Sequence, residues 1–585
     1  MDTTTSQPTA PVAGRRHHPW ARLAAVACVA AVAASAQAQV RRSGRRVVTD
    51  RPFETVWVVD RGMAELQVWQ ALVGATAGDG FRPVVLHLGG DERWTESLNE
   101  LLRALPDGRV VWVGDAGTPV GLDTDGAVHP DALIAGGSRP GPAVYSADAE
   151  LDDLAALIAM RLDGELVVEP PGPGEPAVLV GAAVPASHDQ DGRVVLAGRA
   201  EAIAYANRLA GRPVVLVARR GELLPEHVLW AFQRDAKLLE LAEVPPFALD
   251  DLASETAATL AVRDRIREAL PVLVPGGVPE ALVIAADRDR IPFRFARSTD
   301  ERFACSTCDN GFFEYAADAE YGNLDGDPWG EPEVPVGRLT SPVRDLLAIQ
   351  SVLGLWREHG GFPAATDGVV LGLLGGRSGL RDAMAARWQA FLADRQWWSM
   401  GPEAPGDGYH LDREAFLAVA DRSDLVLVHG HGHPDFLSPD GSPFNQALSG
   451  RDLVARQAPQ RPAFWFLSAC STGKPDRRDH VDEDTLLVGL QSRLAAGSLM
   501  AVEVVGGSSS DLWWLTEAAA PGLTVGELVR RAQAAAVAAY RDQGTVPPGM
   551  ARPCGNPTTD MKNAFPDSIW IGDPLTPIEA PAPGA

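Results

Sequence analysis

The sequence has few lysines, few cysteines and no long hydrophobic run. Lysine occurs only at positions 237, 474 and 562, five cysteines are spread over 585 residues, and acidic residues outnumber basic ones by 77 to 52. The net charge of −25 repels phosphate backbones, so we expect no nucleic-acid partner. A disulfide scaffold would place more cysteines in a much shorter chain. The fold must therefore be stabilised mainly by packing.

The N-terminus has the pattern of a secretory signal peptide. Arginines at positions 15, 16 and 22 flank an apolar run over residues 23–34, and small-x-small cleavage sequences follow at 34–36 and 36–38. This run is shorter than the roughly 20 residues that a membrane-spanning helix needs, and no later segment is apolar enough. We therefore expect removal of residues 1–38 and a secreted or periplasmic protein, with no stable membrane span. An uncleaved anchor is the alternative.

Four cysteines remain after such a cleavage: Cys305, Cys308, Cys470 and Cys554. Since packing must hold the fold, an individual cysteine is available for chemistry. Cys305 and Cys308 are close enough in sequence for a short-loop disulfide, or they stay as two thiols. A closed zinc site would need two further ligands, which the sequence does not offer near them.

Short apolar runs alternate with helical patterns, which indicates an α/β protein with parallel sheets. In a first block we expect strands at 56–59, 84–86 and 110–113, with helices over 63–77 and 96–104. In a second block we expect helices over 151–162 and 200–209, with strands at 194–197 and 214–217. These blocks predict a Rossmann-like N-terminal region over residues 39–270. It forms one unit or two, and a first catalytic subdomain within it is a further interpretation.

A third block, over residues 271–578, carries the residues suited to chemistry. A helix over 253–270 leads into it, and its expected strands are 283–285, 369–374, 425–428, 464–467 and 499–505. Its expected helices are 344–358, 380–394, 413–420 and 525–540. The Pro/Ala/Gly-rich residues 579–585 are predicted to be a disordered tail.

Two strands of this block end in reactive side chains. The apolar run 424–428 leads into His429-Gly430-His431-Gly432-His433, and the run 463–467 leads into Ser468-Ala469-Cys470-Ser471-Thr472-Gly473. The carboxyl ends of parallel strands form the ligand crevice of an α/β sheet. If both strands belong to one sheet, His431 and Cys470 emerge at the same edge.

A cysteine and a histidine at one sheet edge suit nucleophilic catalysis. The attacking species is the thiolate, and a nearby imidazole takes its proton and later protonates the leaving amine. The glycines beside His431 allow a substrate carbonyl to approach the backbone, and the amides of Gly432 and Cys470 are candidates for an oxyanion hole. Either motif alone is more simply explained as a turn or as a small core residue.

The two motifs in this order resemble the caspase–legumain–gingipain clan of cysteine peptidases, which have an apolar strand ending in His-Gly and a later one ending in Ala-Cys. The stretch 318–339, with Tyr321, an Asp-rich turn and Val336-Gly337-Arg338-Leu339, is similar to gingipains in particular. So is Trp570-Ile571-Gly572-Asp573-Pro574-Leu575, which looks like their closing strand. Pro328 and Trp329 depart from the pattern.

The resemblance implies a caspase-like parallel-sheet catalytic domain that hydrolyses peptide bonds, with Cys470 as nucleophile and His431 as acid and base. Protein or peptide substrates are the implied partners, and catalysis needs no cofactor. Asp318 matches an aspartate of the primary specificity pocket, which would favour a basic residue before the scissile bond. Trp513 or Trp514 falls where these enzymes place a pocket wall. An ordinary loop carboxylate and core tryptophans are the alternatives.

Acidic residues alternate in the turn at Asn323, Asp325 and Asp327, with Glu331 and Glu333 downstream. Oxygen ligands at alternate loop positions suit a structural Ca²⁺. The alternative is an acidic turn whose side chains cap the backbone and face solvent.

Three other functions remain open. The histidines at 429, 431 and 433 are spaced like metal ligands on a strand end, which predicts a metallohydrolase. The Leu-Ser-Ala-Cys-Ser-Thr-Gly segment also resembles CHAT-type peptidases of the same clan. The third alternative is an exported binding protein with a degenerate peptidase domain. The role of the N-terminal half and the oligomeric state are not readable from the sequence.

Overall fold

The computed structural model of the chain describes residues 53–78, 81–89, 91–105, 108–115, 117–135, 139–172, 175–181, 193–249, 251–292, 294–296, 314–326, 331–362, 365–373, 378–401, 412–439, 444–456, 461–469, 472, 485–501, 510–543 and 568–579. All of them belong to one compact unit that starts at Val47. The predicted signal segment, all five cysteines and the predicted C-terminal tail from residue 580 lie outside the described residues.

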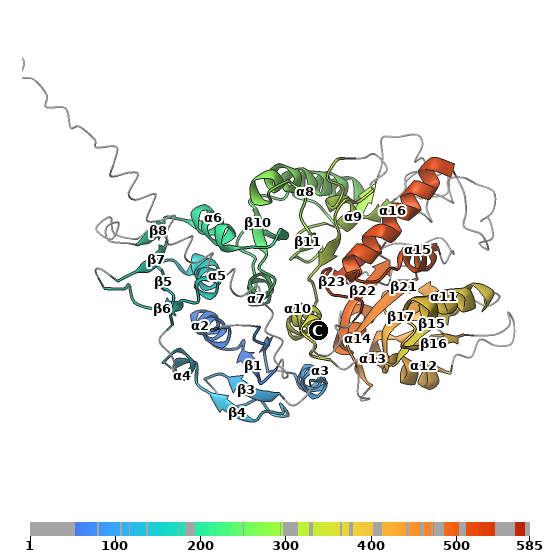
Figure 1. Cartoon of the computed structure of the whole chain (residues 1–585), viewed down its shortest axis with the longest axis horizontal. Helices are drawn as coiled ribbons and strands as arrows, with labels where there is room; N and C mark the ends of the chain where they lie inside the picture. Colours follow the sequence, from blue (N-terminus) through green and yellow to red (C-terminus); the bar gives the residue numbers. More distant parts are fainter. Residues whose placement is uncertain are drawn as a thin grey trace, which may run out of the picture. The chain divides into compact units, whose positions relative to one another are not determined.

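The N-terminal half contains two separate parallel sheets with the same strand order (Figure 1). The first has the order β2-β1-β3-β4 and the second the order β6-β5-β7-β8, and all their pairs are parallel. The first block consists of β1 (Thr55–Asp60), α2 (Glu65–Ala75), β2 (Val84–His87), α3 (Glu92–Arg103), β3 (Arg109–Val113), β4 (Gly126–Val128) and α4 (Pro130–Ala135). The second consists of β5 (Ala143–Ser146), η1 (Ala149–Leu151), α5 (Asp152–Leu162), β6 (Glu165–Val167), β7 (Ala177–Val180), β8 (Val194–Leu196) and α6 (Arg199–Leu209). The sequence left open whether this region forms one unit or two, and the structure gives it two separate sheets within one compact unit.

Helix α5 is buried on every side. Its residues from Leu154 to Ala159 are fully buried, because α2, α6 and α7 (Pro225–Gln233) all contact it. An Ala-rich apolar segment can sit at such a crossing, since small side chains let neighbouring helices approach closely. Arg161 near its end donates hydrogen bonds to the carbonyl oxygens of Ala206 (2.7 Å) and Ala236. Burial lowers the pKa of this guanidinium to about 10.

The remaining long strands form one sheet of ten, in the order β10-β9-β11-β14-β23-β22-β21-β17-β15-β16. These strands are β9 (Val214–Arg219), β10 (Lys237–Leu241), β11 (Ala281–Ile284), β14 (Val336–Arg338), β15 (Asp367–Gly372), β16 (Gln396–Met400), β17 (Ser423–His429), β21 (Ala463–Ser468), β22 (Ala495–Ala501) and β23 (Ser568–Gly572). In this order the first five strands, β10 to β23, run in one direction and the last five, β22 to β16, run in the other. The reason is that β22 and β23 pair antiparallel, whereas all other pairs are parallel.

Helices cover both faces of this sheet. Along β17, Leu425 and Leu427 enter the core that contains residues of α10, while Val426 and Val428 enter a second core that contains residues of α8 and α12. Such strands, buried on both faces, read as continuous apolar runs in the sequence. The helices are α7 (Pro225–Gln233), α8 (Leu252–Leu273), α10 (Arg344–Glu358), α11 (Ser378–Phe391), α12 (Arg413–Ala420), α14 (Leu486–Ser492), α15 (Ser510–Ala518) and α16 (Val525–Gln543).

Short elements connect this framework. They are β12 (Arg294–Ala296), β13 (Glu314–Ala316), α9 (Ala317–Tyr321), β18 (His431–Gly432), β19 (Phe436–Ser438), β20 (Leu448–Ser449) and α13 (Gly450–Val454). The strands β12 and β13 pair with each other, and β18, β19 and β20 form an antiparallel sheet of three. No described helix is long and apolar enough to cross a membrane.

One sequence expectation about this sheet needs correction. In chain order the first strand of the large sheet is β9, so the predicted boundary at residue 271 falls inside the sheet, and the strand at 214–217 does not belong to the second block. This difference concerns strand partners, which short-range patterns do not specify. The strand β23, the last in the chain, lies between β14 and β22.

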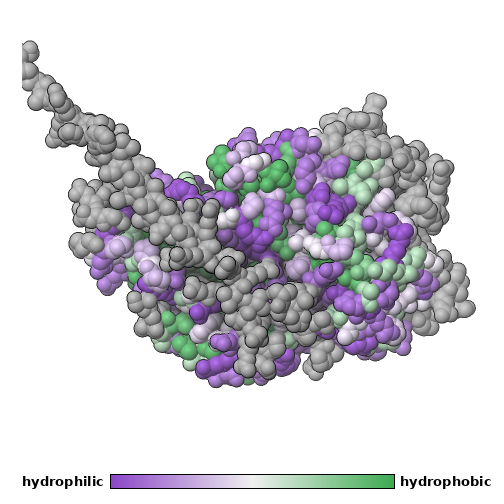
Figure 2. Space-filling view, in the orientation of Figure 1, coloured by the Kyte–Doolittle hydropathy of each residue, from purple (hydrophilic) through white to green (hydrophobic). Residues whose placement is uncertain are grey.

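The visible face in Figure 2 mixes hydrophilic and hydrophobic residues, with hydrophobic ones gathered over α8. Val272 in this helix is 88% exposed, and Val278 beyond it is 58% exposed. Isolated exposed valines are common on soluble proteins and carry no functional meaning by themselves.

Candidate active site

The two strands that lead to His431 and Cys470 are direct neighbours in the ten-stranded sheet. β17 and β21 pair in parallel, and His429 at the end of β17 pairs with Ser468 at the end of β21. His431 and Cys470 each follow two positions later. The sequence expectation that both strands belong to one sheet and end at one edge is therefore correct.

The backbone around His431 is held on both sides. The amide of Leu373, after β15, donates to the carbonyl oxygen of His429 (2.7 Å), and the amide of Gly430 donates to that of Ser468 (3.2 Å). A Cβ atom added at Gly430 would lie 2.9 Å from the Cβ of Leu373. Gly430 is therefore required by close packing against Leu373, a reason that the sequence alone did not suggest.

His431 is exposed and opens the short strand β18, where it pairs with Ser438. The loop that follows turns tightly, because His433 and Phe436 exchange backbone hydrogen bonds of 2.9 and 3.3 Å and their rings stack. The carbonyl oxygen of Pro434 accepts from the amide of Leu486 (2.7 Å) at the start of α14. The His431 segment is thus anchored to the helix that follows the cysteine segment in the chain.

Cys470 lies outside the described residues, but two of its neighbours do not. Ala469 and Thr472 are fully buried, and the hydroxyl of Thr472 donates to the carbonyl oxygen of Ala469 (3.3 Å). The other proposed oxyanion donor, Gly432, is half-buried and pairs with Leu437 across β18 and β19.

Asp318, the expected pocket carboxylate, is bound inside the protein by Arg338. Its two oxygens accept from Arg338 Nη2 (2.6 Å) and Nε (3.0 Å), and both side chains are buried. Arg338 also donates to the carbonyl oxygens of Ala286 (2.8 Å) and Ile291 (3.1 Å). A basic substrate side chain could reach this carboxylate only by displacing Arg338. Asp318 also lines a small hollow with Val336 and Ile569.

Trp513 packs as a core residue of α15. It is 8% exposed, belongs to the same apolar core as Leu425, and has the Arg387 guanidinium 4.5 Å from its ring centre. Trp514 is half-buried and packs against that core. The core-packing alternative of the sequence analysis describes Trp513 better than a pocket wall does.

The acidic turn at residues 323–333 is organised by its own hydrogen bonds. Asn323 is buried, and its Oδ1 accepts from the amide of Gly326 (2.9 Å). Glu333 Oε2 accepts from the amides of Leu324 (2.5 Å) and Asp325 (3.4 Å), and burial raises the pKa of this carboxyl group. Asn323 and Glu333 therefore already accept hydrogen bonds from backbone amides of this turn. This agrees with the alternative in which the acidic side chains cap the backbone. Asp327, the third proposed calcium ligand, lies outside the described residues.

The three histidines proposed as metal ligands differ in burial and in the groups that they contact. His429 is buried within β17, His431 is exposed on β18, and His433 lies 3.3 Å from Asp435 and stacks on Phe436. Within the described ranges, no group of three or more His, Cys, Asp or Glu side chains is placed to hold a metal ion.

Sequence reasoning missed the small sheet β18–β20 and the Arg338–Asp318 pair. Pro434 followed by the alternation in Phe436-Leu437-Ser438 was the available signal for the first. Nothing local signals the second, because Arg338 reads as part of an apolar strand end and its partner lies 20 residues away. The chain matches no protein-family model, and no curated protein is significantly similar to it.

Proposed function

We propose that this protein is an exported cysteine endopeptidase of the gingipain type, with a caspase-like catalytic sheet, Cys470 as nucleophile and His431 as acid and base. The observation that supports it most is the register of β17 and β21, in which His429 pairs with Ser468. His431 follows His429 by two positions and Cys470 follows Ser468 by two positions, so the Cα atom of each lies within about 7 Å of the Cα atom at its strand end. Neighbouring strands are about 4.8 Å apart.

The proposed reaction proceeds in two steps. The Cys470 thiolate attacks the scissile carbonyl carbon, the carbonyl oxygen becomes an oxyanion, and the backbone amides of Gly432 and Cys470 are its proposed donors. His431 then protonates the leaving amine as the C–N bond breaks, which leaves a thioester. In the second step His431 removes a proton from water, the hydroxide adds to the thioester, and the thiolate leaves.

The rigid surroundings of His431 support this role. Catalysis by a general base requires an imidazole that is held within hydrogen-bond reach of the nucleophile. The hydrogen bonds of Leu373 and Gly430, and the bond from Leu486 to Pro434, fix the chain on both sides of His431. The exposure of His431 leaves its ring accessible to a substrate at the carboxyl edge.

Substrate preference is a separate part of the proposal. The gingipain resemblance implies cleavage after a basic residue, through Asp318. Because Arg338 already binds both oxygens of Asp318, we keep the peptide-bond chemistry and do not extend the proposal to a basic preference.

The test compares the full chain with Cys470→Ala and His431→Gln on a peptide library. A matched control is His433→Gln, which removes a neighbouring histidine of the same segment. Both dyad variants should lose at least about 10³-fold in kcat/KM while the control stays within a few-fold. Iodoacetamide should abolish activity and EDTA should spare it. Cleavage that survives in Cys470→Ala, or that EDTA removes, would reject the cysteine mechanism and favour the metallohydrolase.

A search for the mature N-terminus by mass spectrometry tests the export signal.

A further inference from the structure

Arg493, the C-terminal cap of α14, joins four segments of the chain. Its Nη1 donates to both oxygens of Glu100 in α3 (3.1 and 3.2 Å) and to the carbonyl oxygen of Arg456 (2.9 Å), which follows α13. Its Nη2 donates to Oδ1 of Asp421 (3.3 Å), between α12 and β17. The side chains of Arg493 and Glu100 are 3% and 7% exposed, so water hardly reaches the pair. One buried guanidinium group therefore ties the first N-terminal block to segments of the catalytic half.

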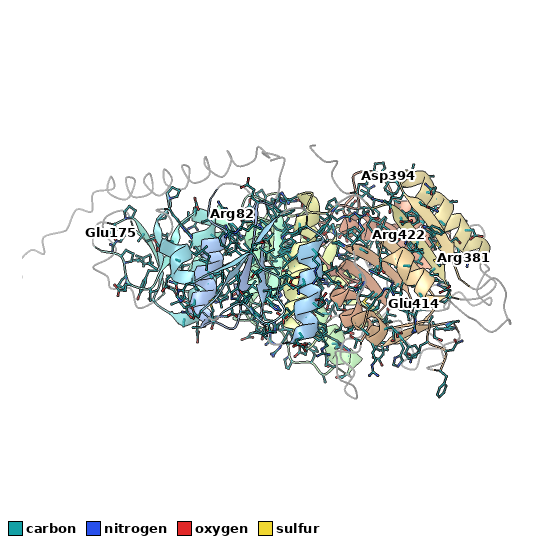
Figure 3. The ribbon with its side chains drawn as sticks, turned by 90° about the horizontal axis from the view of Figure 1, so that it is seen from below. Arg82, Glu175, Arg381, Asp394, Glu414 and Arg422 are labelled. Carbon is teal, nitrogen blue, oxygen red and sulfur yellow. The ribbon has the colours of Figure 1, made fainter. Side chains whose placement is uncertain are left out.

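A second arginine extends these contacts to the surface. Arg456 binds Asp421 Oδ2 through Nη2 (2.7 Å) and Nε (3.1 Å), so Arg456 and Arg493 divide the two oxygens of Asp421 between them. Its Nη1 donates to Glu414 (2.9 Å), which is 74% exposed and is labelled in Figure 3. Charge-assisted bonds to both oxygens of a carboxylate hold it in one orientation. We call Glu100, Asp421, Arg456 and Arg493 the arginine network.

The helices α13 and α14 connect this network to the loop that follows β18. They pack closely, because a Cβ atom added at Gly489 would lie 2.7 Å from the carbonyl oxygen of Gly450. The first residue of each helix holds the loop: the amide of Gly450 donates to the carbonyl oxygen of Asp435 (2.9 Å), and the amide of Leu486 donates to that of Pro434 (2.7 Å). The residues that follow the two helices belong to the network. The loop and the network are thus opposite ends of one packed helix pair.

This arrangement links the first N-terminal block to the proposed catalytic histidine. Arg493 lies about 10 Å along α14 from Leu486, at 1.5 Å per residue. A helix of this length that packs closely against its neighbour moves as a unit, so a shift at the network also displaces the loop after His431. A misplacement of about 1 Å at a reacting group can lower a rate by about 10²-fold.

We propose that Arg493 is a positioning residue of the peptidase, which holds His431 within reach of Cys470 through α14, and that Glu100 is the anchor for it in the N-terminal block. This role rests on the proposed function, since it concerns the same dyad. It also gives the N-terminal half a task that the sequence does not reveal: the first block is part of the catalytic unit and supports its geometry.

The test compares Arg493→Met and Arg493→Lys in the full chain, with Arg61→Met as the matched control. Arg61 also joins the first block to the catalytic half, but its partner Glu226 (2.9 Å) lies in α7 and not in α13 or α14. Arg493→Met should lower kcat by about 10- to 100-fold with little change in KM, because the geometry of the dyad is lost while substrate binding remains. Arg493→Lys keeps the charge and should recover most of this loss. Arg61→Met should lower Tm but keep kcat within about twofold.

A second measurement follows the reactivity of Cys470 and needs no substrate. A histidine close to a cysteine favours the thiolate, so iodoacetamide should alkylate Cys470 readily at pH 6 as well as at pH 9. Mass spectrometry of the peptide that contains Cys470 gives the two rates separately from those of the other cysteines. In Arg493→Met the ratio of the rate at pH 6 to the rate at pH 9 should fall by about tenfold, at a temperature well below its Tm. A merely structural role would lower Tm and leave this ratio unchanged.

The positioning role and the proposed function fail in different ways. If the wild type is active and Arg493→Met keeps its kcat and its alkylation ratio, the positioning role is wrong and the dyad stands. Equal losses of kcat in Arg493→Met and Arg61→Met would reflect general destabilisation and would also overturn the role. If Arg493→Met does not fold, wild-type values of kcat and alkylation ratio in Arg493→Lys would overturn it. A wild type that neither cleaves peptides nor reacts readily at pH 6 would reject the dyad, and the positioning role with it.

Discussion

Replacing Asp318 by Asn separates a structural role of this carboxylate from a role in specificity. Arg338 is fully buried, and Asp318 binds it through hydrogen bonds of 2.6 and 3.0 Å. In Asp318→Asn the guanidinium keeps its carbonyl acceptors, Ala286, Ile291 and Pro292, but loses the charge of the carboxylate that binds two of its nitrogens. Breaking a buried pair in this way costs about 3–5 kcal/mol.

The measurement is urea unfolding followed by tryptophan fluorescence, with peptide cleavage assayed in parallel. A loss of about 3–5 kcal/mol corresponds to a fall of about 1.5–2.5 M in the urea midpoint when the slope m is about 2 kcal/mol/M. The double variant Asp318→Leu with Arg338→Met removes both charges and should recover at least half of that loss, because apolar replacement of a whole buried pair is nearly neutral. Cleavage after Arg and after Leu should fall together.

The reasoning would be refuted by the opposite pattern. If Asp318→Asn keeps the urea midpoint of the wild type and selectively loses cleavage after arginine, the carboxylate belongs to a specificity pocket. Glu320→Gln is the matched control: it removes a buried carboxylate two residues away that pairs with the partly exposed Arg263, so a smaller loss is expected.

Three further predictions concern the rest of the molecule. Gly430→Ala should lower kcat at least tenfold with a small change in Tm, because the added methyl meets Leu373 at 2.9 Å and must shift the His431 segment; unchanged kinetics would contradict this packing argument. Arg161→Met should lower the unfolding free energy by about 2–3 kcal/mol, measured by urea unfolding, because the carbonyl oxygens of Ala206 in α6 and of Ala236 between α7 and β10 lose a charged donor; a neutral effect would show that water replaces it. Burial raises the pKa of Glu100 to about 7, although the charge of Arg493 beside it acts to lower this pKa, so the folded state binds a proton more tightly than the unfolded state. The resulting stability is complete below about pH 4.5 and is lost as the pH rises through about 7. Between pH 5 and 8 the wild type should therefore lose up to about 3 kcal/mol more than Glu100→Gln, and parallel pH profiles would contradict the shift.

The α/β class and the main long strands and helices could be predicted because each depends on short-range periodicity. That His431 and the cysteine strand share an edge followed only on the condition that their two strands belong to one sheet, which the pairing of β17 with β21 meets. The apolar run at 425–428 is buried on both faces, and it reads in the sequence as an uninterrupted strand. Helix α10 was predicted with the bounds Arg344–Glu358 that the structure has, since its apolar spacing is continuous and Pro342 sits just before it.

Strand partners and buried ion pairs could not be predicted, since they join distant parts of the chain. Lys237–Leu241 carries charges at both its first and fourth positions and gives a weak strand pattern, yet it forms an edge of the large sheet. Arg234 and Asp573 form a buried pair although 339 positions separate them. Asp318 binds Arg338 in the same way, and the local sequence gives no sign of it, because Arg338 reads only as the last residue of a strand.

The position of β23 has a consequence for how the chain folds during synthesis. This strand is the last of the ten to leave the ribosome, yet it lies between β14 and β22 and is the junction at which the two oppositely directed halves of the sheet meet. Until it is made, each half exposes an unpaired strand edge, which invites pairing with other chains. Termination of translation upstream of residue 568 should thus produce two half-sheets that cannot join, and such fragments should aggregate rather than retain partial activity.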